Sequence, residues 1–436
     1  MEKITTGKFT QSREADKKIE KDMEIICSEI RKKIPEVLSV ILTGGFSRGE
    51  GAVKKEGKGK NIKFFPYNDY DIQVIAKQGI NKEKTDEIAG KISGRLGYGK
   101  IKEIFYPFEK KKQKLKNNFY IDLKCDTPDD LKKMLPRIRT YELRNNSRIL
   151  YGGDLRVLIP NYKLDEMPLS EGAKLLLDRM SQMIEYYSIN RDYDEEFLTY
   201  IIQQAYAACC TSLLLLSGKY EIGYKKSMEI FKENYKKDFP ELHEKIPELS
   251  RKIEQFIKWK INQKKSPVNA EKEWFIAKKN ILETAKYFFS RFLNKKIENE
   301  EQLSKNILKM RNQFYAPYIK AYISQKIKIN SDLISRFLVP FVGFLLKYRY
   351  YKRLKQIGLN KVLVLLKKSP DLVIFSSLIY LLKSISTENG RDKIDSKYLI
   401  SGKRILNKIY PCYGNNWEEI SLEYANAYIA FFLQKI

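Results

Sequence analysis

The stretch ILTGGFSRGEG (residues 41–51) follows an apolar run and places two glycines before a small hydroxyl, a cation and an anion. Gly44 and Gly49 have the G-x-x-x-x-G spacing of a phosphate-binding P-loop, whose backbone amides wrap an anion. A P-loop needs a lysine directly after its second glycine, and this chain has Glu50 there. The stretch therefore indicates a different glycine turn, reached from a strand.

The residues around this turn predict a small sheet with helices. Residues 13–34 have apolar side chains at helical spacing, and the β-branched run Val37–Leu42 predicts a strand that ends at the turn. The insertion 53–66 is rich in lysine and glycine and predicts an exposed loop. A second strand is expected at Asp69–Ala76 and a helix at Lys82–Arg95.

Two more strands are predicted at residues 100–108 and 118–125, separated by a lysine-rich turn. They are close enough to form a hairpin, so we expect a sheet of mixed direction. After Pro128, residues 129–134 and 137–149 have helical patterns, and YGGDLRVLIP reads as a connection.

From about Leu169 onwards nearly every segment has the helical period. The sequence therefore predicts an α+β fold, in which a small mixed-sheet domain is followed by a large all-α region. We expect three domains: a sheet domain at 1–165, a helical domain at 166–295 and an additional helical domain at 296–436.

Three aspartates form the candidate chemical centre. Asp69 and Asp71 stand two residues apart at the start of a predicted strand, so both side chains project from one face. Asp122 lies inside another predicted strand, where a carboxylate needs compensation. Each feature alone is also typical of a solvated surface. Together, on adjacent strands, they predict a three-carboxylate site for Mg²⁺, which prefers oxygen ligands.

The order GGFSRGE, then NDYDIQVI, then YIDLK resembles the nucleotidyltransferase superfamily, which includes DNA polymerase beta, the minimal nucleotidyltransferases and the antibiotic nucleotidyltransferases. The resemblance covers residues 35–155. It implies that the domain at 1–165 is the catalytic domain and that the helical domain at 166–295 presents the acceptor. It implies transfer of a nucleoside monophosphate from a nucleoside triphosphate, expected to be ATP, to an acceptor hydroxyl with release of pyrophosphate. The acceptor would be a small molecule or a protein.

The resemblance also implies roles for the glycine turn. Gly44, Gly45 and Ser47 would hold the triphosphate through backbone amides and a hydroxyl, at a turn that enters a helix. Arg48 has two interpretations, contact with phosphate or an ion pair with Glu50 that stiffens the turn.

The aspartates would hold metal ions according to the same resemblance. Asp69 and Asp71 would carry the Mg²⁺ bound to the nucleotide, and together with Asp122 they would hold a second Mg²⁺ that activates the acceptor oxygen. Asp122 would also be a candidate to take the acceptor's proton.

The segment YELRNNSRILYGGD (residues 141–154) resembles the stretch that closes the catalytic domain in many members of this superfamily. Arg144, Arg148 and Tyr151 would then line the nucleotide pocket. The alternative is a helix with an exposed basic face, followed by a glycine that ends it.

The chain has a formal net charge of +28, from 82 Lys plus Arg against 54 Asp plus Glu. This balance indicates an anionic partner such as nucleic acid, nucleotide phosphate or an acidic membrane surface, or else solvated lysine-rich faces. Two alternatives therefore stay open: an enzyme that acts on an RNA 3′ end, and a non-enzymatic nucleic-acid-binding protein.

Cysteine and hydropathy patterns predict a cytoplasmic protein. The 5 cysteines include no C-x-x-C pair, which predicts reduced thiols and argues against a zinc site. The only histidine, His243, is predicted to be structural. No signal peptide is expected, and the apolar runs at 337–346 and 372–382 are shorter than the roughly 20 residues of a membrane-spanning helix. Contact with a membrane surface stays an alternative.

Overall fold

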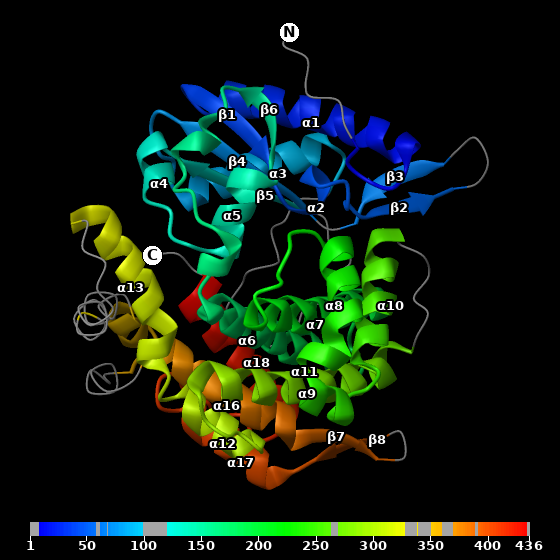
Figure 1. The fold of residues 1–436 in the computed structure, drawn as a ribbon, viewed down its shortest axis with the longest axis vertical. Coiled ribbons are helices and arrows are strands. Elements are labelled where there is room, and N and C mark those ends of the chain that lie inside the picture. The colour runs from blue at the N-terminus through cyan, green and yellow to red at the C-terminus, as the bar shows by residue number, and fades with distance from the viewer. Residues whose placement is uncertain are drawn as a thin grey trace.

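The structure is a computed structural model, and it describes residues 8–57, 62–67, 69–98, 120–262, 269–327, 338, 350–359, 369–388 and 391–433. Figure 1 shows a sheet with its helices lying above a larger, almost entirely helical region. The predicted α+β class is confirmed, because a mixed four-stranded sheet near the N-terminus is followed by helices.

The sheet has the strand order β5-β4-β1-β6. Its strands are β1 (Val37–Leu42), β4 (Asp69–Ala76), β5 (Tyr120–Asp126) and β6 (Arg148–Gly152). Strand β1 is antiparallel to β4 and β6, whereas β4 and β5 are parallel. The strands predicted for β1 and β4 are confirmed at the expected bounds. Strand β5, predicted at 118–125, pairs with β4. The strand predicted at 100–108 lies outside the described residues.

The expectation of a loop at 53–66 is wrong. Strands β2 (Val53–Glu56) and β3 (Lys63–Pro66) form an antiparallel hairpin in this segment. Lysine is uncommon in strands, so the many lysines hide the strand signal. Their aliphatic stems can nevertheless lie along an exposed strand. Tyr67, directly after β3, is buried against Trp259 of the helical region, with ring centroids 6.0 Å apart. Tertiary contact therefore supports a hairpin that local composition does not predict.

Two predicted boundaries around the next strand are wrong. The helix predicted at 137–149 ends at Asn145, and the first two residues of the connection predicted at 151–160 belong to a strand. Residues Arg148–Gly152 form β6, the edge strand that pairs with β1. Leu150 is buried in the core of the sheet domain. Gly152 has φ +80°, and a Cβ there would lie 2.0 Å from the carbonyl oxygen of Leu38. This segment forms a strand because it pairs with β1, which is distant in the sequence, and helical periodicity cannot reveal such pairing.

Helices cover both faces of the sheet. Alternate residues of a strand point to opposite faces of the sheet. Val40 and Leu42 belong to one apolar cluster with α1 and α3, whereas Ile41 and Ile75 belong to a second cluster beside α4 and α5. Asp71 has the same parity as Ile75 and therefore lies on the second face. The four helices are α1 (Arg13–Lys33), α3 (Lys82–Arg95), α4 (Pro128–Lys132) and α5 (Ile138–Asn145).

The helical region is built around one hydrophobic core with members from residues 167–431. The predicted boundaries at 165 and 295 stay predictions. A two-stranded hairpin, β7 (Ile385–Glu388) with β8 (Arg391–Ile394), interrupts the helices. In the described part of this region the named helices are α6 (Leu169–Tyr186), α7 (Glu195–Leu216), α8 (Tyr224–Asp238), α9 (Pro240–Lys245), α10 (Leu249–Asn262), α11 (Ala270–Leu293), α12 (Glu300–Ile307), α13 (Arg311–Ile327), α16 (Pro370–Ser384), α17 (Ser396–Leu406) and α18 (Trp417–Tyr428).

Helix α7 is the centre of this core and packs against α6, α8, α10 and α11. Among the described residues it alone has the length and composition to cross a membrane, yet 89% of its most apolar window is buried inside the protein. Cys209 and Cys210 lie on it and are buried, as expected for core residues. All five cysteines are free thiols.

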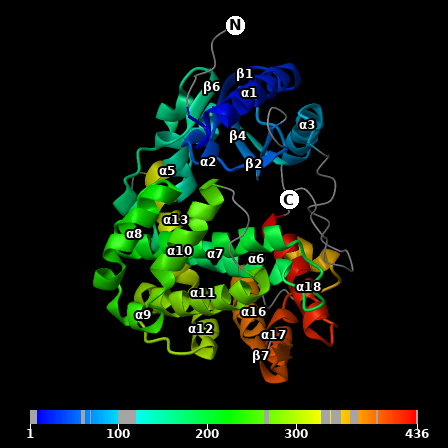
Figure 2. The same ribbon diagram turned by 90° about the vertical axis from the view of Figure 1, so that its right-hand side faces the viewer.

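The sheet domain and the helical region are joined by polar contacts at several points. Lys54 of the β2–β3 hairpin forms an ion pair with Glu196 of α7 at 2.7 Å. The Ile138 amide at the start of α5 donates to Glu171 of α6 at 3.1 Å. Figure 2, turned by 90°, again shows the sheet domain stacked on α6, α8 and α10.

Candidate active site

The glycine turn lies directly against one of the predicted aspartates. The short helix α2 (Gly44–Ser47) begins one residue after β1, and the Thr43 amide donates to the carbonyl oxygen of Asp71 at 2.9 Å. Gly44 has φ +70°, and a Cβ at this position would lie 2.1 Å from Asp71 Oδ2. Glycine is therefore required here both by the backbone conformation and by the close approach of the carboxylate.

Strand pairing places Asp71 directly beside Asp122, because these residues are partners in the parallel β4–β5 register. Asp69 lies two residues before Asp71 on the same face of β4. The Asp122 carboxylate also forms an ion pair with Lys124, with 2.8 Å between Oδ2 and Nζ. Within the part of the chain that the structure describes, no group of three His, Cys, Asp or Glu residues is close enough together to hold a metal ion.

Burial raises the pKa of Asp71 to about 6, and the negative charge of Asp122 acts in the same direction. The cations of Arg139, Arg48 and Lys260 oppose this increase. Two carboxylates on neighbouring strands therefore repel each other in a poorly solvated place, with cationic side chains around them.

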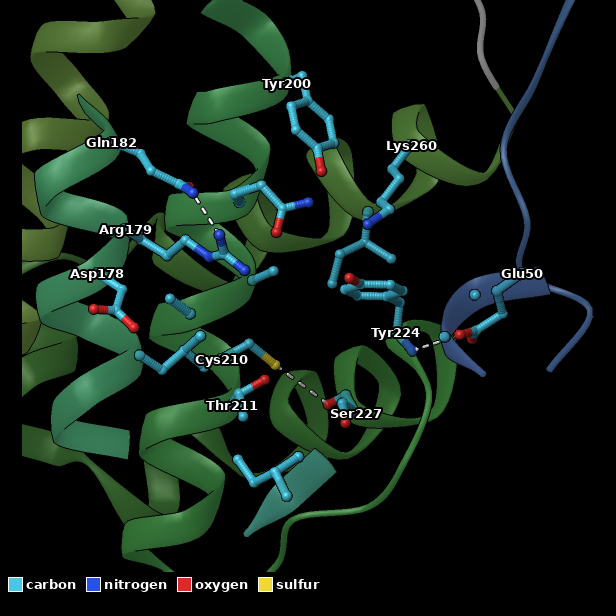
Figure 3. A pocket seen from close by; sticks show the side chains of 18 of the residues that line it. Glu50, Asp178, Arg179, Gln182, Tyr200, Cys210, Thr211, Tyr224, Ser227 and Lys260 are labelled. Carbon is cyan, nitrogen blue, oxygen red and sulfur yellow. Dashed lines mark hydrogen bonds between the residues drawn. The ribbon is translucent and has the colours of Figure 1, made fainter. Parts of the chain in front are cut away.

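A cavity of about 640 Å³ lies between the sheet domain and the helical region. This volume is within the range of small-molecule sites. Figure 3 shows Arg179, Tyr200 and Lys260 directed into it from three different helices. On the sheet side, the wall contains these residues of the predicted site: Gly44, Gly45, Arg48, Asp69 and Asp71.

The opposite wall comes from the helical region, and sequence reasoning missed its polar residues. Lys260 of α10 is buried, and its Nζ lies 3.9 Å from the centroid of the Tyr224 ring. Arg179 of α6 donates to Gln182 at 2.8 Å. A signal for Lys260 was present, because it continues the buried face of α10 after Phe256 and Ile257. A lysine at such a position needs a partner or a ligand.

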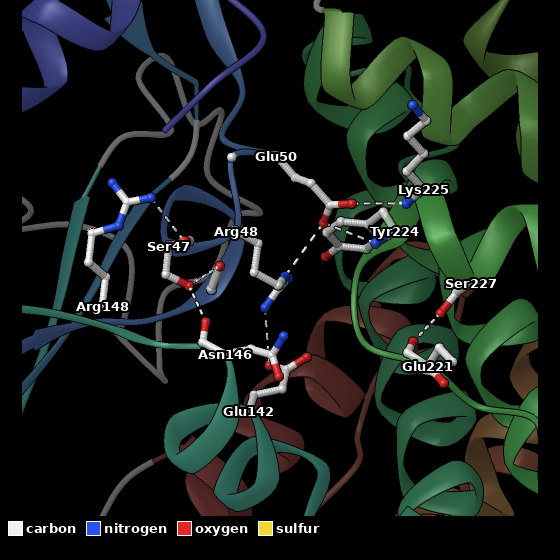
Figure 4. A network of polar contacts seen from close by, with 12 residues as sticks. Ser47, Arg48, Glu50, Glu142, Asn146, Arg148, Glu221, Tyr224, Lys225 and Ser227 are labelled. Atoms are coloured by element: carbon white, nitrogen blue, oxygen red, sulfur yellow. Dashed lines mark hydrogen bonds and ion pairs between the residues drawn. The ribbon is translucent and has the colours of Figure 1, made fainter. Parts of the chain in front are cut away.

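The structure shows that Arg48 forms the ion pair expected in one of its two interpretations, although with long distances. Its Nε lies 3.5 Å from Glu50 Oε2, and its Nη1 lies 3.5 Å from Glu142 Oε2 (Figure 4). Burial raises the pKa of Glu142 above its usual value, although the Arg48 cation opposes that change. Arg48 therefore has acidic neighbours and also contributes to the cavity wall.

Ser47 is not among the residues that line the main cavity. Its buried hydroxyl is within donating distance of two carbonyl oxygens, that of Gly44 at 2.8 Å and that of Asn146 at 2.9 Å. These contacts connect the glycine turn to the segment between α5 and β6. Ser47 lines a smaller neighbouring cavity of about 330 Å³ instead. Asp122 is likewise outside the wall of the main cavity, one strand behind Asp71.

The three residues predicted from the segment 141–154 do not line the main cavity. Arg144 donates to the carbonyl oxygens of Arg156 and Val157 and so fixes the turn after β6. Arg148 lies 4.3 Å from the centroid of the Phe9 ring, and the Tyr151 ring lies beneath the guanidinium of Arg31. Their contacts are those of structural residues.

No family model matches the chain, and no curated protein matches it. Among solved structures, a spectinomycin adenyltransferase from Enterococcus faecialis, determined with ATP and spectinomycin, is similar over 61% of this chain and 98% of that chain. The identity is 13% and the TM-score is 0.36. A similarity of this size carries no argument about function, which must come from the site.

Proposed function

We propose that this chain is a nucleotidyltransferase, which moves a nucleoside monophosphate from ATP or another nucleoside triphosphate to the hydroxyl of a small molecule and releases pyrophosphate. One observation carries the proposal: the glycine turn meets Asp71 at the wall of a cavity, and Asp122 stands beside Asp71 on the next strand. The motif order in the sequence, which resembles the nucleotidyltransferase superfamily, agrees with this arrangement.

Two of the predicted carboxylates, those of Asp71 and Asp122, lie side by side where a divalent cation could accept oxygen ligands from both. Burial, followed by the negative charge of the adjacent Asp122, raises the pKa of Asp71, and a cation between the two carboxylates would remove their repulsion. The three aspartates are not gathered closely enough in this structure, so Asp69 would have to turn toward the other two to complete a Mg²⁺ site. The bound Mg²⁺ would neutralise charge on the triphosphate and on the attacking oxygen. Lys124, now paired with Asp122, would have to move aside or remain as a partner of the other oxygen.

The triphosphate would be held by groups from both walls. Gly44 and Gly45 expose backbone at the turn, and Arg48 and Lys260 bring cations to the same cavity from opposite sides. Both ion pairs of Arg48 are 3.5 Å long, so a phosphate oxygen would compete well for its guanidinium.

The cavity favours a small acceptor that is neutral or positively charged. Its wall has seven carboxylates and five cationic side chains, so it is acidic although the whole chain has a charge of +28. This lining has no excess of cationic side chains, which is the usual mark of an RNA-binding surface. The carboxylates are Glu50, Asp69, Asp71, Glu142, Glu171, Asp178 and Glu185, and the cations are Arg48, Arg139, Lys174, Arg179 and Lys260.

The test is incubation of the protein with Mg²⁺, each nucleoside triphosphate labelled at the α-phosphate, and separated small-molecule, protein and RNA fractions of a cell extract. We expect pyrophosphate release and label in the small-molecule fraction. Label in the protein or RNA fraction would overturn the acceptor class, and RNA transfer would also weaken steeply with salt. Pyrophosphate release that survives Asp69→Asn together with Asp71→Asn would overturn the site itself. Asp129→Asn, an exposed change, is the control.

A further inference from the structure

The side chain of Glu50 leaves the glycine turn and binds the helical region. Its Oε2 accepts a hydrogen bond from the Tyr224 amide at 3.0 Å, and its Oε1 accepts one from the Lys225 amide at 2.9 Å (Figure 4). These amides belong to the first two residues of α8, 174 residues further along the chain. Glu50 is buried at 9% exposure, so its charge is poorly screened by solvent.

Helix α8 needs this carboxylate, because it has no side-chain cap of its own. The first amides of a helix have no partner within the helix, and the helix dipole favours a negative charge there. The preceding residue is Gly223, with φ +107°, and a Cβ at that position would lie 3.2 Å from Glu50 Oε1. A glycine thus leaves room for the carboxylate, which takes the place of an N-cap residue.

The start of α8 also forms part of the cavity wall. Tyr224 and Ser227 line the cavity, and the Lys260 ammonium group lies over the Tyr224 ring. Gly44 and Gly45, a few residues before Glu50, line the opposite wall. The Glu50 carboxylate therefore links the α8 wall directly to the glycine turn.

The alternative for Glu50 is an ion pair with Arg48 that only stiffens the turn. The distances favour α8, because the two amide bonds are 3.0 and 2.9 Å long whereas the contact with Arg48 Nε is 3.5 Å. Both carboxylate oxygens are also used by α8, and only one of them is near Arg48.

We propose that Glu50 is a positioning residue, which fixes Tyr224 and Lys260 relative to the glycine turn and so sets the width of the nucleotide site. The effect on nucleotides rests on the proposed function. The anchoring of α8 does not, and it can be measured without any substrate.

The experiment changes the contact from each side. Glu50→Ala removes both acceptors, whereas Lys225→Pro removes one donor and is tolerated because proline suits the first turn of a helix. Lys225→Ala keeps the amide and is the control for Lys225→Pro. Glu56→Gln, an exposed change on β2, is the control for Glu50→Ala, and Glu50→Gln is a milder variant that keeps the side-chain shape.

Two readouts are combined: amide hydrogen exchange at the start of α8, and KM and kcat for ATP with Mg²⁺. For Glu50→Ala we expect faster exchange in residues 224–228 and a KM increase of about tenfold with a smaller change in kcat, because charge-assisted hydrogen bonds are lost. Lys225→Pro should raise KM by less, and the double variant should add little to Glu50→Ala.

Unchanged exchange at α8 in Glu50→Ala would overturn the anchoring. Faster exchange with unchanged KM would reduce Glu50 to a structural cap and would overturn its positioning role. If the wild type neither binds ATP nor releases pyrophosphate, the proposed function and the positioning role fail together, while the exchange measurement still decides whether α8 is anchored by Glu50.

Discussion

Two aspartates in different regions of the molecule have the same altered acidity but different surroundings. Burial raises the pKa of Asp71 in the sheet domain and of Asp371 in the helical region to about 6 in each case. Asp371 is 4% exposed near the start of α16 and accepts a hydrogen bond from the Leu372 amide at 2.9 Å. Asp71 has the charge of Asp122 beside it and a cavity in front of it. An unusual pKa therefore marks burial, and only the neighbours of the group indicate a functional site.

The largest expected effect separates these two residues by activity. Asp71→Asn should reduce Mg²⁺-dependent pyrophosphate release by roughly 10³-fold, since it removes a negative charge aimed at the reacting groups. Asp371→Asn should leave the rate within about twofold, because Asp371 is not part of the cavity wall. Steady-state rates of the two variants test this. Equal losses would show that both act through stability, and the comparison would then fail.

The next effect concerns the glycine turn at Asp71. Gly44→Ala should lower the rate about 100-fold, because the added Cβ would lie 2.1 Å from Asp71 Oδ2 and must displace this carboxylate. Gly97→Ala is a matched control with φ +81° and nothing within 4 Å of an added Cβ. It has the same backbone cost, roughly 1 to 2 kcal/mol in unfolding free energy, without the clash. If both variants lose activity equally, backbone strain and not the carboxylate contact explains Gly44.

The third prediction tests the sign of the pKa change in the helical core. The pKa of Asp371 in the folded protein, about 6, is above its ordinary value of 3.8. Its contribution to stability is therefore complete below pH 3.8 and is lost as the pH rises through 6. Asp371→Asn should thus stabilise the protein by about 2 to 3 kcal/mol at pH 8 and by very little near pH 3.5. Denaturant unfolding at both pH values measures this. A gain that is equal at both would contradict the buried charge as the cause.

The smallest effect concerns the cations that distinguish the Asp71 site. Lys260 lowers the pKa of Asp71 and lies against Tyr224 in the cavity wall. Lys260→Met should raise KM for ATP about tenfold and move the acidic limb of the pH–rate profile to higher pH. Lys258→Met, an exposed change on the same helix, is the control. A profile shifted to lower pH would show that Lys260 does not act on Asp71.

Local sequence patterns predicted much of the sheet. Strands β1 and β4 and helix α3 have the predicted bounds, because each is a continuous run of the right residue types between glycine, proline or asparagine signals. Strand β6 and the β2–β3 hairpin were missed, since their stability comes from β1 and from contact with the helical region. The pairing of β5 with β4 likewise needed the fold, although the prediction that Asp71 and Asp122 lie on adjacent strands was right.

By itself, the sequence determined the α+β class and the order of the glycine turn and the aspartates. Alternation along a strand has a period of two residues, so it fixed the shared face of Asp69 and Asp71 without any other part of the chain. Only the tertiary structure decided that Lys260 faces these residues and that Glu50 caps α8. The physical reason is distance along the chain, because contacts between residues 174 positions apart depend on how whole domains pack and leave no local period to read.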